Sequence, residues 1–162
     1  MKTILVRPAD NLEEIMHIYG NTLFRLSLIT LGNANDAEDV VQETLIKYFE
    51  KHPIFQDSEH EKAWLIKVAT NKCKDILRYK SRHPMVNIDE IQEFVKEIEG
   101  NEILEILISL PEKYRIVLVL YYVEGYKIPE ISDFVGKTNS AVKMRLQKGR
   151  RLLEEAYRKE FE

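Results

Sequence analysis

The chain has 162 residues, of which 44% are hydrophobic and 31% charged, and a formal net charge of −3. This composition is typical of a soluble, core-forming protein, and the few glycines and prolines favour long helices over many strands. No apolar run approaches the roughly 20 residues of a membrane span, and the N-terminal stretch is too short for a signal peptide. The single cysteine, Cys73, excludes an internal disulfide and is typical of the reducing cytoplasm.

Charges are segregated along the sequence. Residues 36–61 hold eight acids and two bases, and residues 83–112 hold eight acids and one base. Residues 62–82 hold seven bases and one acid, and residues 137–159 hold eight bases and two acids. Two separated basic blocks favour two contacts with a polyanion and leave acidic surfaces for other partners. Chance fluctuation in a charge-rich helical protein is the alternative.

Apolar residues at spacings of three and four predict a helix from about Leu12 to Leu31, which Gly32 ends. A second helix is predicted over residues 37–51, with Asn35 or Asp36 as its N-cap. On the outward face of this helix, the apolar Ile46 lies among carboxylates, which would suit docking of a basic partner helix. A solvated helix face is the alternative. The outward face comprises Asp36, Asp39, Gln42, Glu43, Ile46 and Glu50.

A third helix is predicted over about residues 61–80, after a loop over residues 52–60 in which Pro53 blocks continuation of the second helix. Its outward stripe can hold a phosphate backbone and stack on bases. For Trp64 alone, a core anchor is the alternative, and Cys73 is expected to be a small core residue. The outward stripe comprises Lys67, Asn71, Lys74 and Arg78 with Trp64 at its edge, and the inward side comprises Leu65, Val68, Ala69, Cys73 and Ile76.

Residues 83–100 break the helical pattern and are predicted to be a linker between two all-helical domains, residues 1–82 and residues 101–162. Helices are expected over about residues 103–110 and 112–123, and with those that follow they can bury a small core of their own. The apolar positions of residues 112–123 are Tyr114, Val117, Leu118, Tyr121 and Tyr122.

The stretch from Gly125 to Arg151 has the pattern of a helix-turn-helix motif. Pro129 suits the first turn of a short helix and Gly136 suits its end. In such motifs the second helix enters a DNA major groove, but bihelical turns are also common packing units. The buried side of the second helix comprises Val142, Leu146, Gly149 and Leu153. Its outward row comprises Ser140, Met144, Gln147 and Arg151, flanked by Lys143, Lys148 and Arg150.

The sequence contains no catalytic constellation: it has no glycine-rich phosphate loop, no Ser/Cys–His motif and no metal-ligand cluster. A thiol–imidazole pair of His60 and Cys73 is conceivable, but nothing in the sequence places the two together. We therefore expect neither an enzyme nor a metal site nor a cofactor.

Four stretches in order resemble the extracytoplasmic-function sigma factors of bacterial RNA polymerase. They are DAEDVVQETLIKYFE at residues 36–50, WLIKVATNKCKDILR at 64–78, LPEKYRIVLVLYYVEGY at 110–126 and IPEISDFVGKTNSAVKMRLQKGRRLL at 128–153. The likeness extends from about Leu12 to Arg158. It implies two helical domains, sigma region 2 (residues 1–82) and sigma region 4 (residues 101–162).

The resemblance also implies roles for these surfaces. The family's acidic helix docks on the largest subunit of core RNA polymerase, which here falls on Asp36, Asp39, Gln42, Glu43 and Ile46. Promoter DNA is the second implied partner. Its minus-ten element would contact residues 55–62 and then Trp64, Lys67, Asn71, Lys74 and Arg78, with an unpaired base captured. Its minus-thirty-five element would contact Lys143, Met144, Gln147 and Lys148, with Ser140, Arg150 and Arg151 beside them.

This sequence departs from the family pattern at several positions of the motif. Lys127-Ile128-Pro129 stands where a Ser or Thr often precedes the first helix, and Ser140-Ala141 replaces a frequent Gly-Thr pair. Met144 replaces a common Ser, and because Met cannot donate a hydrogen bond, the base preference is expected to differ. Arg145 borders the buried side and is assigned either to a flanking phosphate or to packing of its stem.

The leading hypothesis is thus a non-catalytic, cytoplasmic sigma factor held inactive by an anti-sigma partner. A free-standing helix-turn-helix regulator is the second hypothesis, and a helical hydrolase has almost no support. Only the first requires an acidic docking helix upstream of a second basic helix.

Overall fold

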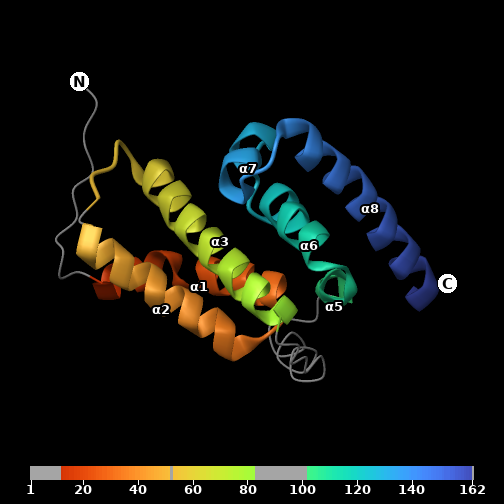
Figure 1. Cartoon of the computed structure of the whole chain (residues 1–162), viewed down its shortest axis with the longest axis horizontal. Coiled ribbons are helices and arrows are strands. Elements are labelled where there is room, and N and C mark those ends of the chain that lie inside the picture. Colours follow the sequence, from red (N-terminus) through yellow and green to blue (C-terminus); the bar gives the residue numbers. More distant parts are fainter. Residues whose placement is uncertain (1–11, 52, 83–101, 162) are drawn as a thin grey trace.

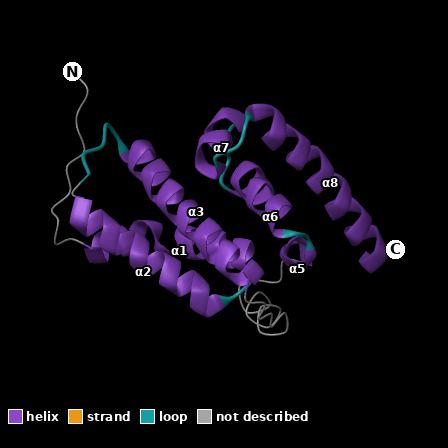
Figure 2. Cartoon of the chain, viewed as in Figure 1, coloured by secondary structure: helices purple, strands orange, loops and turns teal. Residues whose placement is uncertain are grey.

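The computed structural model describes residues 12–51, 53–82 and 102–161. In these ranges the chain forms helices joined by short loops, which confirms the all-helical prediction (Figure 2). The elements are α1 (Leu12–Leu31), α2 (Ala34–Lys51), α3 (Ser58–Arg82), α5 (Glu102–Ser109), α6 (Glu112–Leu118), the π-helical turn η1 (Val119–Val123), α7 (Ile128–Val135) and α8 (Asn139–Phe161). The linker predicted over residues 83–100 lies outside the described residues. None of the described helices is long and apolar enough to span a membrane.

Helices α1, α2 and α3 pack together into the first half of the molecule (Figure 1). Helix α2 begins three residues earlier than predicted, because Asn33 Oδ1 accepts a hydrogen bond from the backbone N–H of Asp36 at 2.9 Å. Asn33 is therefore the residue whose side chain caps this helix, and the predicted caps, Asn35 and Asp36, are wrong. Helical spacing also predicts an inward face of Ala37, Val40, Val41, Thr44, Leu45 and Tyr48, and all of these are buried except Leu45, which is half-buried.

A buried carboxylate joins the three helices of this half. Glu61, in the first turn of α3, is 0% exposed and accepts hydrogen bonds from the hydroxyls of Tyr19 on α1 (2.7 Å) and Tyr48 on α2 (2.8 Å). A buried carboxylate needs such partners, because removal from water otherwise strongly disfavours its charge. The sequence pattern placed Glu61 among the surface acids, whereas the structure makes it the polar centre of the bundle.

In the second half, α8 lies against α6 at a close approach. A Cβ atom added at Gly149 would lie 3.1 Å from Leu118 Cδ1 and 3.3 Å from Tyr114 Cβ, so glycine allows the two helices to approach. Arg115 of α6 is also buried, and its Nη1 donates to the carbonyl of Ile108 on α5 at 3.1 Å. Burial lowers the pKa of this guanidinium, and the nearby Glu112 opposes that shift.

Two of the apolar positions named for residues 112–123, Tyr121 and Tyr122, lie on the surface. Their side chains are 39% and 53% exposed, whereas Tyr114, Val117 and Leu118 are buried as expected. The cause is η1: the N–H of Glu124 bonds to the carbonyl five residues earlier, at Val119, over 3.0 Å. This wider turn rotates the following side chains away from the face that α-helical spacing assigns to them.

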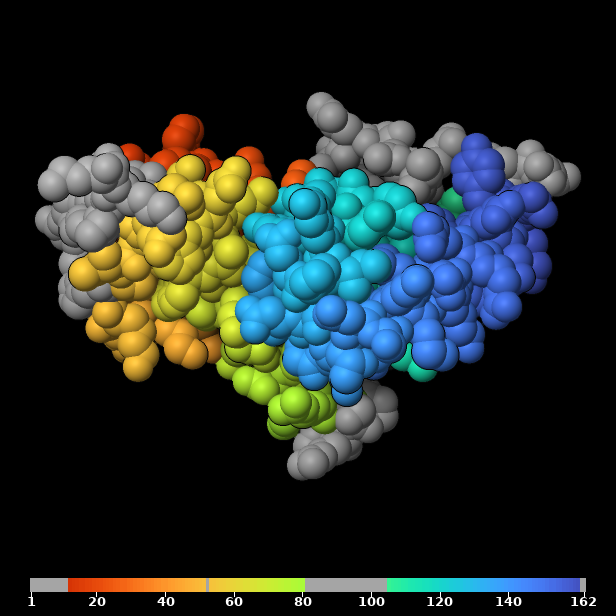
Figure 3. Space-filling view, turned by 90° about the horizontal axis from the view of Figure 1, so that it is seen from above, coloured from red at the N-terminus to blue at the C-terminus, as the bar shows by residue number. Residues whose placement is uncertain are grey.

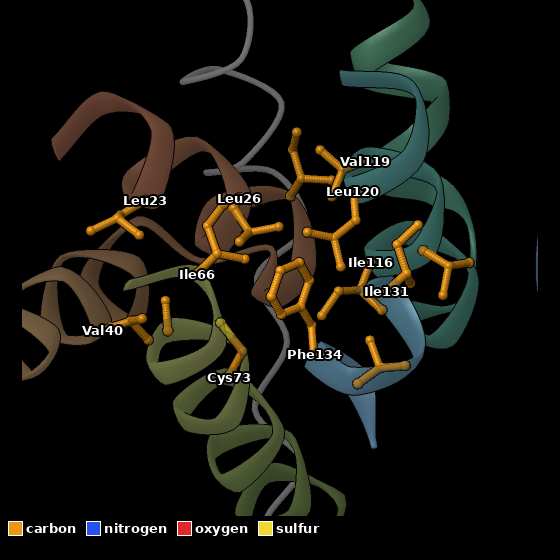
Figure 4. Close-up of a cluster of buried hydrophobic side chains, with 14 of the residues drawn as sticks. Leu23, Leu26, Val40, Ile66, Cys73, Ile116, Val119, Leu120, Ile131 and Phe134 are labelled. Atoms are coloured by element: carbon orange, nitrogen blue, oxygen red, sulfur yellow. The ribbon is translucent and has the colours of Figure 1, made fainter. Parts of the chain in front are cut away.

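The cores of the two halves form one continuous hydrophobic cluster. Leu23, Leu26, Val40, Ile66 and Cys73 of the first half lie in the same cluster as side chains of the second half (Figure 4). The second-half members labelled there are Ile116, Val119, Leu120, Ile131 and Phe134. The sequence predicted a separate small core for each half. The described residues instead place α3 against α7, and α1 against α5, α6 and η1.

Candidate interfaces for nucleic acid and polymerase

Helices α7 and α8 form the predicted helix-turn-helix. Helix α7 ends at Gly136, whose φ of +67° is the left-handed conformation that glycine adopts readily. At the start of α7, the N–H of Lys127 bonds to Glu130 Oε1 at 3.1 Å, which supplies a cap although no Ser or Thr precedes this helix. The Thr138 hydroxyl accepts from the Ala141 N–H at 3.1 Å and caps α8. These local bonds fix where α8 begins and hence which side chains face outward.

The outward row of α8 lies on the surface, as the helical spacing predicted. Met144 is 69% exposed, and Leu146 on the opposite side is 3% exposed. Arg145 lies between the two faces and is half-buried, which agrees with its ambiguous position in the sequence. All seven side chains proposed for DNA contact are exposed: Ser140, Lys143, Met144, Gln147, Lys148, Arg150 and Arg151.

The outward face of α2 carries acids and two exposed apolar side chains. Ile46 is 53% exposed, and Phe49, three residues later, is 46% exposed. Phe49 was not predicted as a site residue, although its i+3 spacing from Ile46 on a polar face is a signal for it in the sequence. We use the term docking face for Asp36, Asp39, Gln42, Glu43 and Ile46, all of which are exposed except the half-buried Asp36.

Two acids of the docking face are paired with α3. Asp36 Oδ2 lies 2.5 Å from Lys80 Nζ, and Glu43 Oε2 lies 2.8 Å from Lys72 Nζ. The hydrogen bond with Glu43 raises the pKa of Lys72. Asp39 forms no ion pair with any described residue and is the acid of this face that is open to an incoming cation.

An open hollow of about 390 Å³ lies between α2 and α3. Trp64 is half-buried at its edge, with its ring 5.8 Å from that of Tyr48 and 6.0 Å from that of Phe55. Trp64 therefore packs in an aromatic cluster, as a core anchor would. It also lines the hollow, where a base could stack on it. The hollow is lined by Lys47, Lys51, Trp64, Lys67, Val68 and Asn71.

Lys47 and Lys51 were not predicted as site residues. Both belong to α2, whose acidic outward face is the predicted polymerase contact. The side chains of the two lysines line the hollow instead. A signal was present in the sequence, because the two lysines are four residues apart and so share one helix face. The hollow thus combines three lysines, an amide and an indole.

The other predicted contacts of α3 divide into two groups. Asn71 and Arg78 are exposed, with Arg78 Nη1 3.5 Å from Asp75 Oδ1. Lys67 and Lys74 instead face α7: Lys67 Nζ lies 3.1 Å from Asp133 Oδ1, and Lys74 Nζ donates to the carbonyl of Val135 at 2.7 Å. Burial lowers the pKa of Lys74, with further contributions from the neighbouring cations Arg78 and Lys137.

The imagined pairing of His60 and Cys73 does not form. His60 Nδ1 accepts from the Gln56 N–H at 3.1 Å on the exposed start of α3, whereas Cys73 is buried thirteen residues further along the same helix. Thirteen residues of helix span roughly 20 Å. Among the residues that the structure describes, no group of three or more His, Cys, Asp or Glu side chains is arranged to hold a metal ion.

This fold defines a class of protein: an all-helical DNA-binding protein with a helix-turn-helix, which here also carries an acidic helix exposed on one face. Comparison with known families is consistent with this class. The Sigma-70 region 2 model matches residues 15–83, and the Sigma-70 region 4 model matches residues 100–153. The chain belongs to the sigma factors of bacterial RNA polymerase, in the extracytoplasmic-function (ECF) group.

Curated relatives and solved structures extend over nearly the whole chain. The ECF RNA polymerase sigma factor SigW of Bacillus subtilis is 27% identical across 92% of this chain and 90% of its own length. The sigma factor RpoE of Bartonella quintana, solved with the anti-sigma factor NepR, superposes with a TM-score of 0.68 at 20% identity, over 90% of this chain and 96% of its own. CnrH, solved with the cytosolic domain of CnrY, gives a TM-score of 0.59 at 22% identity, over 89% of this chain and 85% of its own.

Proposed function

We propose that this sigma factor binds core RNA polymerase through α2 and promoter DNA through α3 and α8, without itself being a catalyst. The observation that carries the proposal is the combination of three exposed surfaces on one chain. These are the acidic docking face with Ile46 at its centre, the basic hollow between α2 and α3, and the outward row of α8. Its site of action is the cytoplasm, where polymerase and promoter meet.

The docking face suits a basic, partly apolar helix of the polymerase. Carboxylates attract and orient a cationic partner, whereas the apolar side chains supply the contact area that gains free energy on burial. Ile46 and Phe49 supply that area, and Asp39 is the acid without an internal ion pair among the described residues. Asp36 and Glu43 would exchange their lysine partners on α3 for cations of the polymerase.

The hollow between α2 and α3 suits a single nucleotide that has left the DNA stack. Base stacking on an aromatic side chain contributes about 1–3 kcal/mol per base, which helps to offset the few kcal/mol that unpairing costs. Trp64 supplies the aromatic surface, Asn71 can bond a base edge, and the three lysines can hold the flanking phosphates. Lys47 and Lys51 therefore join the proposed minus-ten contacts.

The outward row of α8 suits a major groove. Gln147 can bond an adenine edge in bidentate fashion, and Met144 offers an apolar contact such as the methyl group of thymine accepts. Lys143 and Lys148 lie beside them, with Lys148 Nζ 5.8 Å from the centre of the Tyr114 ring. We assign Arg150 and Arg151 to phosphates.

An anti-sigma factor is the proposed regulator. RpoE and CnrH, which share this fold, were each solved with a second protein: NepR, described as an anti-sigma factor, and the cytosolic domain of CnrY. In this chain, the exposed acids of α2 and the exposed bases of α8 are the surfaces that an inhibitor would have to cover to prevent polymerase and promoter binding.

Run-off transcription with purified bacterial core polymerase on a promoter library tests the proposal. The full chain should produce promoter-dependent transcripts, and Asp39→Lys should weaken its binding to core polymerase at least fivefold. Glu38→Lys on the same helix is a charge-matched control that leaves the docking face intact. Absence of transcripts from every promoter would refute the proposed function, and equal polymerase affinity of the two variants would refute the docking assignment.

A further inference from the structure

We propose that Lys113 of α6, together with Lys148 of α8, holds a backbone phosphate of promoter DNA, so that the DNA contact extends beyond the helix-turn-helix. This inference rests on the proposed binding of α8 to a major groove, in which α6 has no assigned part. In Figure 3 the blue surface of α8 adjoins the cyan surface of the residues before it. A phosphate contact at this junction would fix the orientation of α8 in the groove without reading the sequence.

Helix α6 lies along one flank of the outward row of α8. Gly149 approaches α6 so closely that an added Cβ would lie 3.3 Å from Tyr114 Cβ. Helical spacing places the exposed Lys148 between this contact and Gln147 of the outward row. The major groove is about 12 Å wide, and the phosphates of the two strands line its edges. The N-terminal end of α6 therefore lies on the side where one strand would pass when α8 occupies the groove.

Two ammonium groups from different helices converge on one tyrosine. Lys113 Nζ lies 5.1 Å from the centre of the Tyr114 ring, and Lys148 Nζ lies 5.8 Å from it. Burial alone would raise the pKa of the Tyr114 phenol, but hydrogen bonds from Lys148 and Lys113, with the charges of both, lower it. The phenol oxygen is thus an acceptor that the two ammonium groups share.

No described acid neutralises these two lysines. Neither forms an ion pair with a described residue, and the neighbouring Glu112 lies 3.9 Å from Arg115 Nη2 instead. Two like charges near one point repel each other, and an anion placed between them removes that repulsion. A phosphate oxygen offers both ammonium groups a charged acceptor in place of a neutral phenol. The arrangement therefore suits an anion that comes from outside the protein.

The neighbouring charges favour DNA over an isolated small anion. Lys143, Arg150 and Arg151 are exposed on the same helix as Lys148. Lys113 adds a cation beyond that helix, so the basic surface continues from α8 onto α6. A surface of this kind follows an extended polyanion, whereas a single ion needs an enclosed site.

Loss of one phosphate contact has a characteristic salt dependence. Each phosphate neutralised on B-DNA changes the slope of log affinity against log salt concentration by about −0.9. Lys113→Gln should therefore weaken duplex binding about tenfold at 50 mM salt and only about threefold at 200 mM. The loss should be the same on every sequence, because a phosphate carries no base identity. Lys113→Arg keeps the charge and should restore most of the affinity.

Anisotropy of labelled DNA duplexes, titrated with the full chain at several salt concentrations, measures these effects. Lys159→Gln is the matched control, because it removes one exposed lysine from the last turn of α8, far from the proposed contacts. It should keep the affinity and the salt slope of the unmutated chain. Thermal melts should show the same Tm for Lys113→Gln and Lys159→Gln, since both side chains are exposed.

A second measurement locates the phosphate. Duplexes that carry one neutral methylphosphonate each, moved along both strands, report which phosphates the protein needs. At one position the neutral group should weaken the unmutated chain and Lys159→Gln about tenfold at 50 mM salt. It should leave Lys113→Gln almost unaffected, because the side chain and the phosphate form a single contact.

Specific outcomes overturn the inference. Equal affinity and equal salt slope of Lys113→Gln and Lys159→Gln would show that Lys113 does not contact DNA. A changed preference among sequences in Lys113→Gln would make Lys113 a base contact. If the unmutated chain binds no duplex at 50 mM salt but supports run-off transcription with core polymerase, the inference fails while the sigma function stands. If it does neither, the proposed function fails as well.

Discussion

Replacing Tyr48 by Phe tests whether the buried carboxylate of Glu61 stabilises the first half. The change removes only the hydroxyl that donates to Glu61 Oε2 over 2.8 Å, in a site where the carboxylate is 0% exposed. Hydrogen bonds to charged groups contribute about 1.5–3 kcal/mol each, so the free energy of unfolding should fall by that amount. In a chain of this size each kcal/mol corresponds to roughly 2–4 °C in Tm.

Urea unfolding followed by circular dichroism measures the loss, and emission of Trp64 provides a local probe. The tryptophan is suitable because its ring lies 5.8 Å from the ring of Tyr48, so loosening of this contact should shift its emission to the red. Tyr122→Phe removes a hydroxyl from a side chain that is 53% exposed and serves as the matched control. We expect this control to change the unfolding free energy by less than about 0.5 kcal/mol.

Repeating Tyr48→Phe in a chain that already carries Glu61→Leu distinguishes the loss of the hydrogen bond to the carboxylate from a loss of packing. With Glu61→Leu already present, the Tyr48 hydroxyl has lost its charged acceptor, so the bond that Tyr48→Phe removes no longer exists. Tyr48→Phe should therefore cost clearly less unfolding free energy in that background than in the unmutated chain. An equal loss in both backgrounds would show that Tyr48 acts through something other than Glu61, and the reasoning would be refuted.

Three further predictions concern α8 and the core. Replacing Lys143 and Gln147 with Ala should change the preference among upstream promoter sequences by about 1–3 kcal/mol per lost base contact, measured on a duplex library, whereas uniform weakening would make them phosphate contacts. Gly149→Ala should lower Tm in thermal melts, because overpacking at 3.1 Å from Leu118 Cδ1 costs about 1–3 kcal/mol, whereas alanine regains only about 0.5–1 kcal/mol of helix propensity; an unchanged or higher Tm would contradict that close packing. Burial raises the pKa of the Cys73 thiol to about 12, so at pH 8 a thiol reagent should modify it only after denaturant is added, and fast labelling of the native protein would contradict its burial.

The sequence was most informative about which side chains of a single regular helix face the core and which face solvent. On α8, the positions of Val142 and Leu146 on one side and of Met144 and Gln147 on the other follow from the spacing of 3.6 residues per turn, and the structure confirms them. The same reasoning succeeded for the outward face of α2. A face of a regular helix is a local property, and amphipathic spacing encodes it directly.

Local spacing failed where the helix departs from regular geometry or where two helices meet. The π-helical turn that exposes Tyr121 and Tyr122 is closed by bonds such as that from the Glu124 N–H to the Val119 carbonyl, which the pattern of residues did not indicate. Contacts between the halves, such as that of Lys74 with α7, join positions 61 residues apart. Periodicity indicates that Lys74 is on the outward side of α3, but it carries no information on what lies opposite.

Ion pairs within the chain limit how much affinity its charged side chains can contribute to partner binding. Glu43 of the docking face is paired with Lys72, and Lys67, a proposed DNA contact, is paired with Asp133. Polymerase and DNA would replace these contacts with contacts of the same kind, so each exchange would contribute little net affinity and mainly select partners of the right charge. Net affinity must then come from side chains that form no ion pair among the described residues, such as Ile46 on α2 and Met144 and Gln147 on α8. On this argument, removing Ile46 should weaken polymerase binding more than removing Glu43, although Glu43 is the charged residue of the two.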